Sequence, residues 1–178
     1  MIKSPKISLI GAGIMSATLG VIIKQLIPNA QISIFERLDK IGAESSDVWN
    51  NAGTGHSAFC ELNYTPERVD GTIDISKALR ISESFEISKQ LWSYLIETGK
   101  VKTDKPFIND IDHMSFVWGA NNRSFLKKRF DALTKYGMFK DMKYSESYNE
   151  ILEWLPLMMK GRKRDETISV TRMDIGTD

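Results

Sequence analysis

The chain of 178 residues has one cysteine, Cys60, and two histidines, His56 and His113. A single cysteine excludes an internal disulfide and a multi-cysteine metal site. The two histidines are too few and too far apart in the sequence for a histidine-based metal cluster. We therefore expect no metal site, and the scarcity of cysteine favours a reducing, cytoplasmic compartment.

The sequence also lacks a charge excess and a long apolar run. It has 24 Lys and Arg against 23 Asp and Glu, a net charge of +1, so it has no overall attraction for nucleic acid. No apolar run approaches the roughly 20 residues of a membrane-spanning helix, and no signal peptide is recognisable. Any membrane contact is expected to be peripheral. With 42% hydrophobic and 26% charged residues, the composition is that of a globular protein with a core.

The amino-terminal third is predicted to form a strand–helix–strand unit. Residues 6–10 and 31–35 are short apolar segments typical of buried strands, and residues 14–27 between them predict a helix. This helix has so few polar residues that we expect it to be covered on most sides. A βαβ unit of this length predicts that its two strands are parallel.

The turn between the first strand and the helix has small residues at the three positions of a G-x-G-x-x-G pattern: Gly11, Gly13 and Ser16. Gly11 permits a tight turn, Gly13 lets a phosphate approach the backbone, and Ser16 still allows close helix–strand packing. The helix start offers N–H groups and a partial positive charge. We expect a dinucleotide pyrophosphate here; the alternative is a glycine turn that binds nothing.

Glu36 lies at the end of the second predicted strand, where its carboxylate can accept hydrogen bonds from ribose hydroxyls. An acid here disfavours the 2′-phosphate of NADP, and a surface carboxylate is the alternative. Arg37 is expected beside the adenine or in solvent. The βαβ unit does not by itself distinguish FAD from NAD.

Residues 44–66 show no helical or alternating pattern, and such a long irregular segment inside a domain is typically functional or disordered. Its aromatic residues argue against disorder. At its start, Ser45 and Ser46 either reach the pyrophosphate or cap a helix.

The middle of this segment is suited to contact a flat, uncharged ring. Asn51 and Thr54 are uncharged hydrogen-bonding residues, and Gly53 lets the backbone come close. His56 could accept a substrate hydroxyl proton, or it simply hydrogen-bonds a loop carbonyl. Cys60 has apolar and acidic neighbours, which do not activate a thiol, so we expect it to be structural.

The rest of the chain predicts helices and short strands. The expected elements are a helix capped by Asp74 and stopped by Gly99, a strand at 113–119, a helix at 122–136, a helix started by a Ser147–Glu150 capping box, and a segment at 167–176 that is extended and then turns. Lys127, Lys128 and Arg129 are expected on the solvent side of their helix. The basic stretch 160–164 is a solvated loop, a substrate-attracting surface or a contact for an anionic membrane.

Six segments, in order along the chain, resemble the malate:quinone oxidoreductase family. They are LIGAGIMSATLG (9–20), IFERLD (34–39), ESSDVWNNAGTGHSAFCELNYTP (44–66), FEISKQLW (85–92), WLPLMMKGR (154–162) and DIGTD (174–178). Among these, NNAGTGH followed by CELNYTP is the most specific. The resemblance covers nearly the whole chain.

The resemblance implies an FAD enzyme that oxidises L-malate to oxaloacetate in the tricarboxylic acid cycle and passes electrons to membrane quinone, at the inner face of the cell membrane. With FAD as the cofactor that the resemblance implies, the expected FAD-binding residues are Gly11, Gly13, Ser16, Glu36, Arg37, Ser45, Ser46, Asn51, Gly53 and Thr54, and the expected catalytic residue is His56. A dicarboxylate also needs a cation, for which Arg68, Arg123, Arg162 and Arg172 are candidates.

The expected fold class is α/β. We expect a Rossmann-like FAD-binding βαβ unit with its cofactor-embracing arm in residues 1–73, and part of a mixed α+β substrate region in residues 74–178. Because only two strands of a parallel sheet are evident, we expect a fragment of a longer two-domain flavoprotein. Two alternatives remain: a related FAD-dependent 2-hydroxyacid or amino-acid oxidase, and a catalytically inert dinucleotide-binding fragment.

Overall fold

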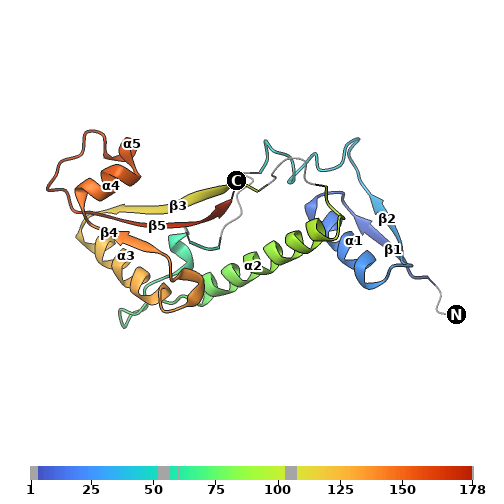
Figure 1. Ribbon diagram of the computed structural model, residues 1–178, viewed down its shortest axis with the longest axis horizontal. Coiled ribbons are helices and arrows are strands. Elements are labelled where there is room, and N and C mark those ends of the chain that lie inside the picture. Colours follow the sequence, from blue (N-terminus) through green and yellow to red (C-terminus); the bar gives the residue numbers. More distant parts are fainter. Residues whose placement is uncertain (1–3, 52–56, 60, 103–107, 178) are drawn as a thin grey trace. The chain divides into compact units, whose positions relative to one another are not determined.

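The computed structural model describes residues 4–51, 57–59, 61–102 and 108–177. Contacts divide the chain into two compact units, Met1–Gly53 and Thr54–Asp178. By these contacts the segment after Gly53 belongs to the second unit. The functional division at residues 73 and 74 stays a prediction. Helices and strands of both units are labelled in Figure 1.

The first unit is the predicted βαβ arrangement, with strand β1 (Lys6–Ile10), helix α1 (Ile14–Leu26) and strand β2 (Gln31–Phe35). The strands pair in parallel, from Lys6 opposite Gln31 to Ile10 opposite Phe35, which confirms the prediction. Helix α1 packs closely on β1 at Gly20, where an added Cβ would lie 3.5 Å from a methyl group of Leu9.

The expectation that α1 is covered on most sides is wrong for this chain. Only Gly20 is buried along α1, and Met15 and Leu26 are 81% and 76% exposed. The apolar pattern indicates a helix suited to burial, but the two-stranded sheet of this unit is too narrow to cover it.

The second unit contains the other elements. They are the short 3-10 turn η1 (Leu62–Tyr64), α2 (Ser76–Glu97), β3 (Asp110–Trp118), α3 (Ala120–Leu133), the 3-10 turn η2 (Gly137–Phe139), β4 (Lys143–Ser145), α4 (Tyr148–Trp154), α5 (Pro156–Met159) and β5 (Ile168–Thr177). Strands β3, β5 and β4 form an antiparallel sheet in that order.

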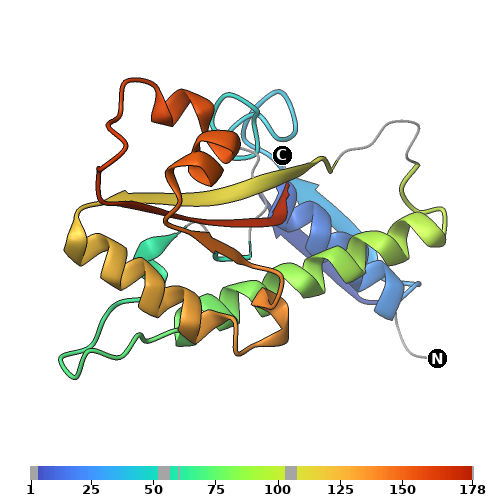
Figure 2. The same ribbon diagram turned by 60° about the vertical axis from the view of Figure 1, so that its left-hand side comes forward.

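Helices cover both faces of this sheet: α4 and α5 lie on one face and α3 on the other (Figures 1 and 2). On the α4–α5 face, Ile151 and Met159 pack with Ile168 and Val170 of β5. On the other face, Leu133 of α3 and Met173 of β5 belong to a cluster that also includes residues 58 and 59. Alternate residues of β5 thus reach two separate cores.

Local signals predicted α2 well and later elements less well. Asp74 accepts a hydrogen bond from the Ser76 N–H at 3.0 Å, and Gly99 ends the helix region with φ +67°. The second half of the 167–176 segment was predicted to turn. This is wrong, because β5 continues as a strand to Thr177 through its pairing with β3.

The predicted capping box at the start of α4 does not form. Ser147 is the N-cap residue but makes no side-chain capping bond. Instead the buried Ser145 hydroxyl accepts from the Ser147 N–H at 3.0 Å and donates to the Glu150 carboxylate at 2.6 Å. The hydroxyl that bonds at the start of α4 therefore comes from Ser145, at the end of β4, and not from Ser147 as the sequence pattern predicted.

Candidate functional site

The turn after β1 begins at Gly11, which has φ +86°, a conformation that side-chain-bearing residues rarely adopt. Its N–H donates to the Phe35 carbonyl at the end of β2, at 2.7 Å. The turn is therefore anchored to the carboxyl end of the neighbouring strand, which is where dinucleotide-binding sheets receive their ligand.

Gly13 is the N-cap residue of α1 and lies against Ser46. A Cβ added to Gly13 would be 3.0 Å from the Ser46 Oγ. This hydroxyl accepts a hydrogen bond from the Ile14 N–H at 2.9 Å. Ser46 thus caps α1 from a distant loop, the second of the two roles predicted for it, and this contact does not decide the first.

The Glu36 carboxylate lies beside the same turn. Its Oε1 accepts from the Leu38 N–H at 2.9 Å, and its Oε2 accepts from the Ala12 N–H at 2.7 Å. The Leu38 bond first, then the Ala12 bond, and further the N–H and charge of Arg37, lower the pKa of Glu36. Glu36 is therefore ionised at neutral pH and connects the end of β2 to the glycine turn.

These groups surround a pocket of about 320 Å³ within the first unit. Six of the residues predicted to bind FAD line it: Gly11, Gly13, Glu36, Arg37, Ser45 and Ser46. Two others lie nearby in the chain without lining it. Ser16 is in the first turn of α1, and Asn51 donates from its side-chain amide to the Ser45 carbonyl at 3.0 Å.

Sequence reasoning missed Gly42, whereas Asn50 was recognised as one of the uncharged hydrogen-bonding residues of the irregular segment. Gly42 lines the pocket with φ +65°, and its N–H donates to the Ala12 carbonyl at 3.0 Å, which brings the loop after β2 onto the glycine turn. The Asn50 side chain donates to the Glu44 carbonyl at 3.1 Å. An isolated glycine in the loop after the second predicted strand was the available signal for Gly42.

Gly53, Thr54 and His56, and likewise Cys60, lie outside the described residues, and their roles stay predictions. The residues that follow His56 in the chain are described. Ser57, Ala58 and Phe59 are fully buried in the second unit, and Ala58 has φ +63°.

The prediction that Arg129 lies on the solvent side of α3 is wrong. Arg129 is fully buried on the same face as Leu126 and Leu133. Its Nε donates to the Thr65 hydroxyl at 2.9 Å, and its Nη2 donates to the Ala58 carbonyl at 3.4 Å and to the Phe59 carbonyl. Acceptors some 70 residues earlier in the sequence make this burial possible. Lys127 and Lys128 are exposed, as predicted.

The four arginines considered for substrate binding all have carboxylate partners in the second unit. Arg68 pairs with Asp74 at 2.9 Å, and Arg123 pairs with Glu146 at 3.3 Å. The remaining pairs are Arg162 with Glu166 and Arg172 with Asp112. The geometry therefore does not single out one of them as a substrate ligand.

Metal binding and membrane insertion are two other classes of function that the structure bears on. Within the described ranges, no group of three His, Cys, Asp or Glu side chains could hold a metal ion. Among the helices of the same residues, none has the length and hydropathy needed to span a membrane.

Comparison with known proteins identifies the family. The family model described as malate:quinone oxidoreductase matches residues 3–178. Relatives with the name "Probable malate:quinone oxidoreductase" include one from Flavobacterium johnsoniae, 59% identical over 99% of this chain, and one from Wigglesworthia glossinidia brevipalpis, 59% identical over 98%. "Probable malate:quinone oxidoreductase 1" of Pseudomonas aeruginosa is 55% identical over 99%.

The chain spans about a third of the length of these curated relatives: 35%, 34% and 34%, respectively. Because the match covers nearly every residue of this chain, it confirms the resemblance seen in the six sequence segments. The α/β fold class expected from the sequence is also the one that the structure shows. On this evidence, the chain belongs to the malate:quinone oxidoreductase family.

Proposed function

We propose that the first unit binds the nucleotide part of FAD and that the protein contributes to the oxidation of L-malate to oxaloacetate with quinone as electron acceptor, a reaction of the tricarboxylic acid cycle. Family membership supports the reaction. The pocket in which the glycine turn, Glu36 and Ser46 meet is the observation that carries the cofactor assignment.

The residues around the pocket fit a diphosphate joined to ribose. The N–H groups of Gly13, Met15 and Ser16 belong to the first turn of α1, so they have no acceptor further back in the helix. The Ser46 oxygen accepts from Ile14, which leaves its O–H to donate to a phosphate oxygen.

Glu36 fits the ribose in the same way. An ionised carboxylate has about four acceptor sites, and two are used by Ala12 and Leu38, so others remain for ribose hydroxyls. The pocket volume of about 320 Å³ lies at the lower end of the range for ligand sites, about 300–1,000 Å³, which suits the nucleotide end of FAD.

FAD, when bound, supplies the acceptor for the hydride that leaves C2 of malate, and its two electrons go on to quinone. For the chain's own residues, we propose that Asn51, Gly53 and Thr54 contact the cofactor and that Arg37 and Ser45 border its nucleotide part. His56 would take the malate hydroxyl proton, because a neutral imidazole can accept a proton near pH 7.

Gly13→Val tests the cofactor assignment. We expect the variant purified from cells to contain less than a tenth of the flavin of the parent protein, measured by visible absorption, because the side chain blocks the approach of the diphosphate. Gly137→Val is the matched control, since a Cβ at Gly137 meets no atom within 4 Å. Unchanged flavin content in Gly13→Val would refute the assignment.

Steady-state assays then distinguish the reaction from that of a related oxidase. Malate-dependent reduction of a quinone analogue without peroxide supports the proposal. Peroxide formation with another 2-hydroxy acid or an amino acid would support an oxygen-using oxidase instead. A flavin-loaded protein that turns over neither substrate would support the inert alternative.

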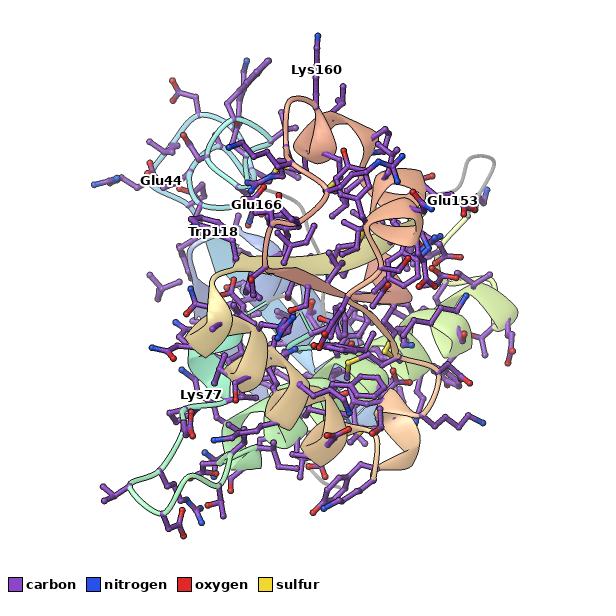
Figure 3. The ribbon with its side chains drawn as sticks, turned by 90° about the vertical axis from the view of Figure 1, so that its left-hand side faces the viewer. Glu44, Lys77, Trp118, Glu153, Lys160 and Glu166 are labelled. Carbon is purple, nitrogen blue, oxygen red and sulfur yellow. The ribbon has the colours of Figure 1, made fainter. Side chains whose placement is uncertain are left out.

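We further propose that the region around α5 makes peripheral contact with the inner face of the cell membrane. Leu157 is 88% exposed, and Lys160, Lys163 and Arg164 follow it as exposed basic residues. Figure 3 shows Lys160 pointing away from the ribbon at the end of α5. An exposed apolar residue beside basic side chains is suited to an anionic lipid surface.

Co-sedimentation with vesicles of anionic phospholipid tests this contact. Leu157→Asn and Lys160→Gln should each reduce binding, while Lys77→Gln, on α2, should not. Binding that is the same for all three variants would reject this surface.

A further inference from the structure

We propose that Arg129 is a positioning residue: its buried guanidinium fixes the backbone at Ala58 and Phe59. These two residues directly follow residues 50–57, the polar middle of the irregular segment 44–66, which we call the 50–57 segment. The effect of Arg129 on catalysis rests on the proposed function, which assigns residues between 51 and 56 to contacts with flavin and substrate. Its structural content rests only on contacts within the second unit.

Two nitrogens of the planar Arg129 guanidinium, Nε and Nη2, donate hydrogen bonds to residues within the stretch 58–65. Its Nη2 donates to the carbonyls of both Ala58 and Phe59, and its Nε donates to the Thr65 hydroxyl. The guanidinium also lies over the Phe59 ring, 5.6 Å from its centre. A fork with fixed geometry holds several acceptors at once, which a single ammonium group does not.

The burial of Arg129 shows that these contacts are more than incidental. The residue is fully buried between Leu126 and Leu133 on one face of α3, where a leucine would continue the apolar stripe. A buried cation is unfavourable unless hydrogen bonds compensate for lost hydration. At this position arginine supplies hydrogen-bond donors to the consecutive carbonyl groups of Ala58 and Phe59, and leucine has no such donors.

Ala58 supplies a second, independent observation. Its φ of +63° is unusual for a residue with a Cβ, and such conformations persist where the surroundings hold them in place. The carbonyls held by Arg129 are those of Ala58 and of the residue after it. The clamp and the strained residue therefore coincide at the point where the chain leaves the 50–57 segment.

This arrangement attaches the chain directly after the 50–57 segment to a helix, α3, that packs on the β3–β5–β4 sheet. Functional groups in loops act accurately when a rigid element supports the loop. In an enzyme active site, a displacement of about 1 Å can cost roughly 100-fold in rate. Arg129 would therefore influence the reaction through the backbone after His56 without touching malate.

Amide hydrogen exchange of peptides covering residues 57–65 tests the clamp. Arg129→Met removes all donors, Arg129→Lys keeps the charge but not the fork, and Thr65→Val removes one acceptor at nearly constant shape. The matched controls are Thr65→Ser, which keeps the hydroxyl, and Lys128→Met, at the exposed neighbour that pairs with Glu67. If Arg129→Met does not fold, Thr65→Val and Arg129→Lys still decide the question.

We expect exchange in peptides 57–65 to speed up by about tenfold or more in Arg129→Met, less in Arg129→Lys and Thr65→Val, and not in the controls. In the flavin-loaded protein, kcat with malate should fall about 10- to 100-fold with a smaller change in KM. Unchanged exchange at 57–65, an equal loss of protection across α2 and β5, or an unchanged kcat would overturn the proposal. A parent protein without flavin would refute the proposed function, and the exchange data would still decide the clamp.

Discussion

The contact between Gly13 and Ser46 gives the sharpest prediction about the site. Gly13 has φ −87°, so alanine is conformationally allowed there, but the new Cβ would lie 3.0 Å from the Ser46 Oγ. To relieve this contact, the Ser46 side chain must move away from the Ile14 N–H that it now accepts at 2.9 Å. Gly13→Ala should therefore cost the hydrogen bond that caps α1.

The magnitude follows from capping energetics. Loss of an N-terminal capping bond costs about 1 kcal/mol, within a range of about 0.5–2. Ser46→Ala should cost the same, because it removes the same bond. In the double variant the nearest remaining atom is the Ser46 Cβ at 4.0 Å, an ordinary contact. The second substitution should then add almost nothing, giving a coupling energy of about 1 kcal/mol.

Amide hydrogen exchange of peptides from α1 measures these differences, since 1 kcal/mol corresponds to about fivefold in the local opening equilibrium. Both single variants and the double variant should exchange about fivefold faster than the parent. Flavin affinity should behave differently: if the proposed diphosphate binds at this turn, Gly13→Ala should weaken it even with Ser46→Ala, because the added Cβ still occupies space at the start of α1. If the effects of Gly13→Ala and Ser46→Ala on exchange were additive in the double variant, the contact with Ser46 would not be the reason for a glycine at position 13.

Three further predictions concern other sites. His56→Ala should slow flavin reduction by malate in stopped-flow measurements, and an unchanged rate would remove its proposed proton-transfer role. Burial first, and then the hydrogen bond to Glu146, raise the pKa of Tyr144 to about 12 from 10.0. Ultraviolet titration should show this shift, Glu146→Gln should reduce it, and the stabilisation should be complete below pH 10 and vanish as the pH rises towards 12. Ser145→Ala should lower the free energy of unfolding by about 1 kcal/mol in urea titrations, and Ser147→Ala by clearly less, because only Ser145 makes the capping bonds at α4; equal effects would contradict this reading.

The structure also shows which kinds of sequence signal are reliable. Helix α2 was predicted to within two residues at each end, because Asp74 and Gly99 act on backbone groups close to them in the sequence. The βαβ unit was predicted equally well, since strand, glycine turn and helix follow one another within 30 residues. In both cases the deciding contacts are local.

Signals failed where a partner lies far away in the sequence. Strand β5 continues to Thr177 because β3, an earlier strand, pairs with it along its length. The capping box failed for a different, local reason: Ser145, only two residues before Ser147, bonds to both groups of the expected box. Gly42 was overlooked because its contact with the Ala12 carbonyl depends on how the loop after β2 folds back. Periodicity describes one element at a time and carries no information on these contacts.

The sequence by itself determined the family, the parallel βαβ unit and six of the residues that line the pocket at the glycine turn, because these depend on short, ordered patterns of residues. Only the tertiary structure decided that Glu36 binds the turn through Ala12 and that Ser46 caps α1. It alone placed Arg129 in the core, with acceptors at Ala58, Phe59 and Thr65. The physical reason is common to all three: a charged or polar side chain takes its position from whichever partner compensates its lost hydration, and that partner is set by the fold.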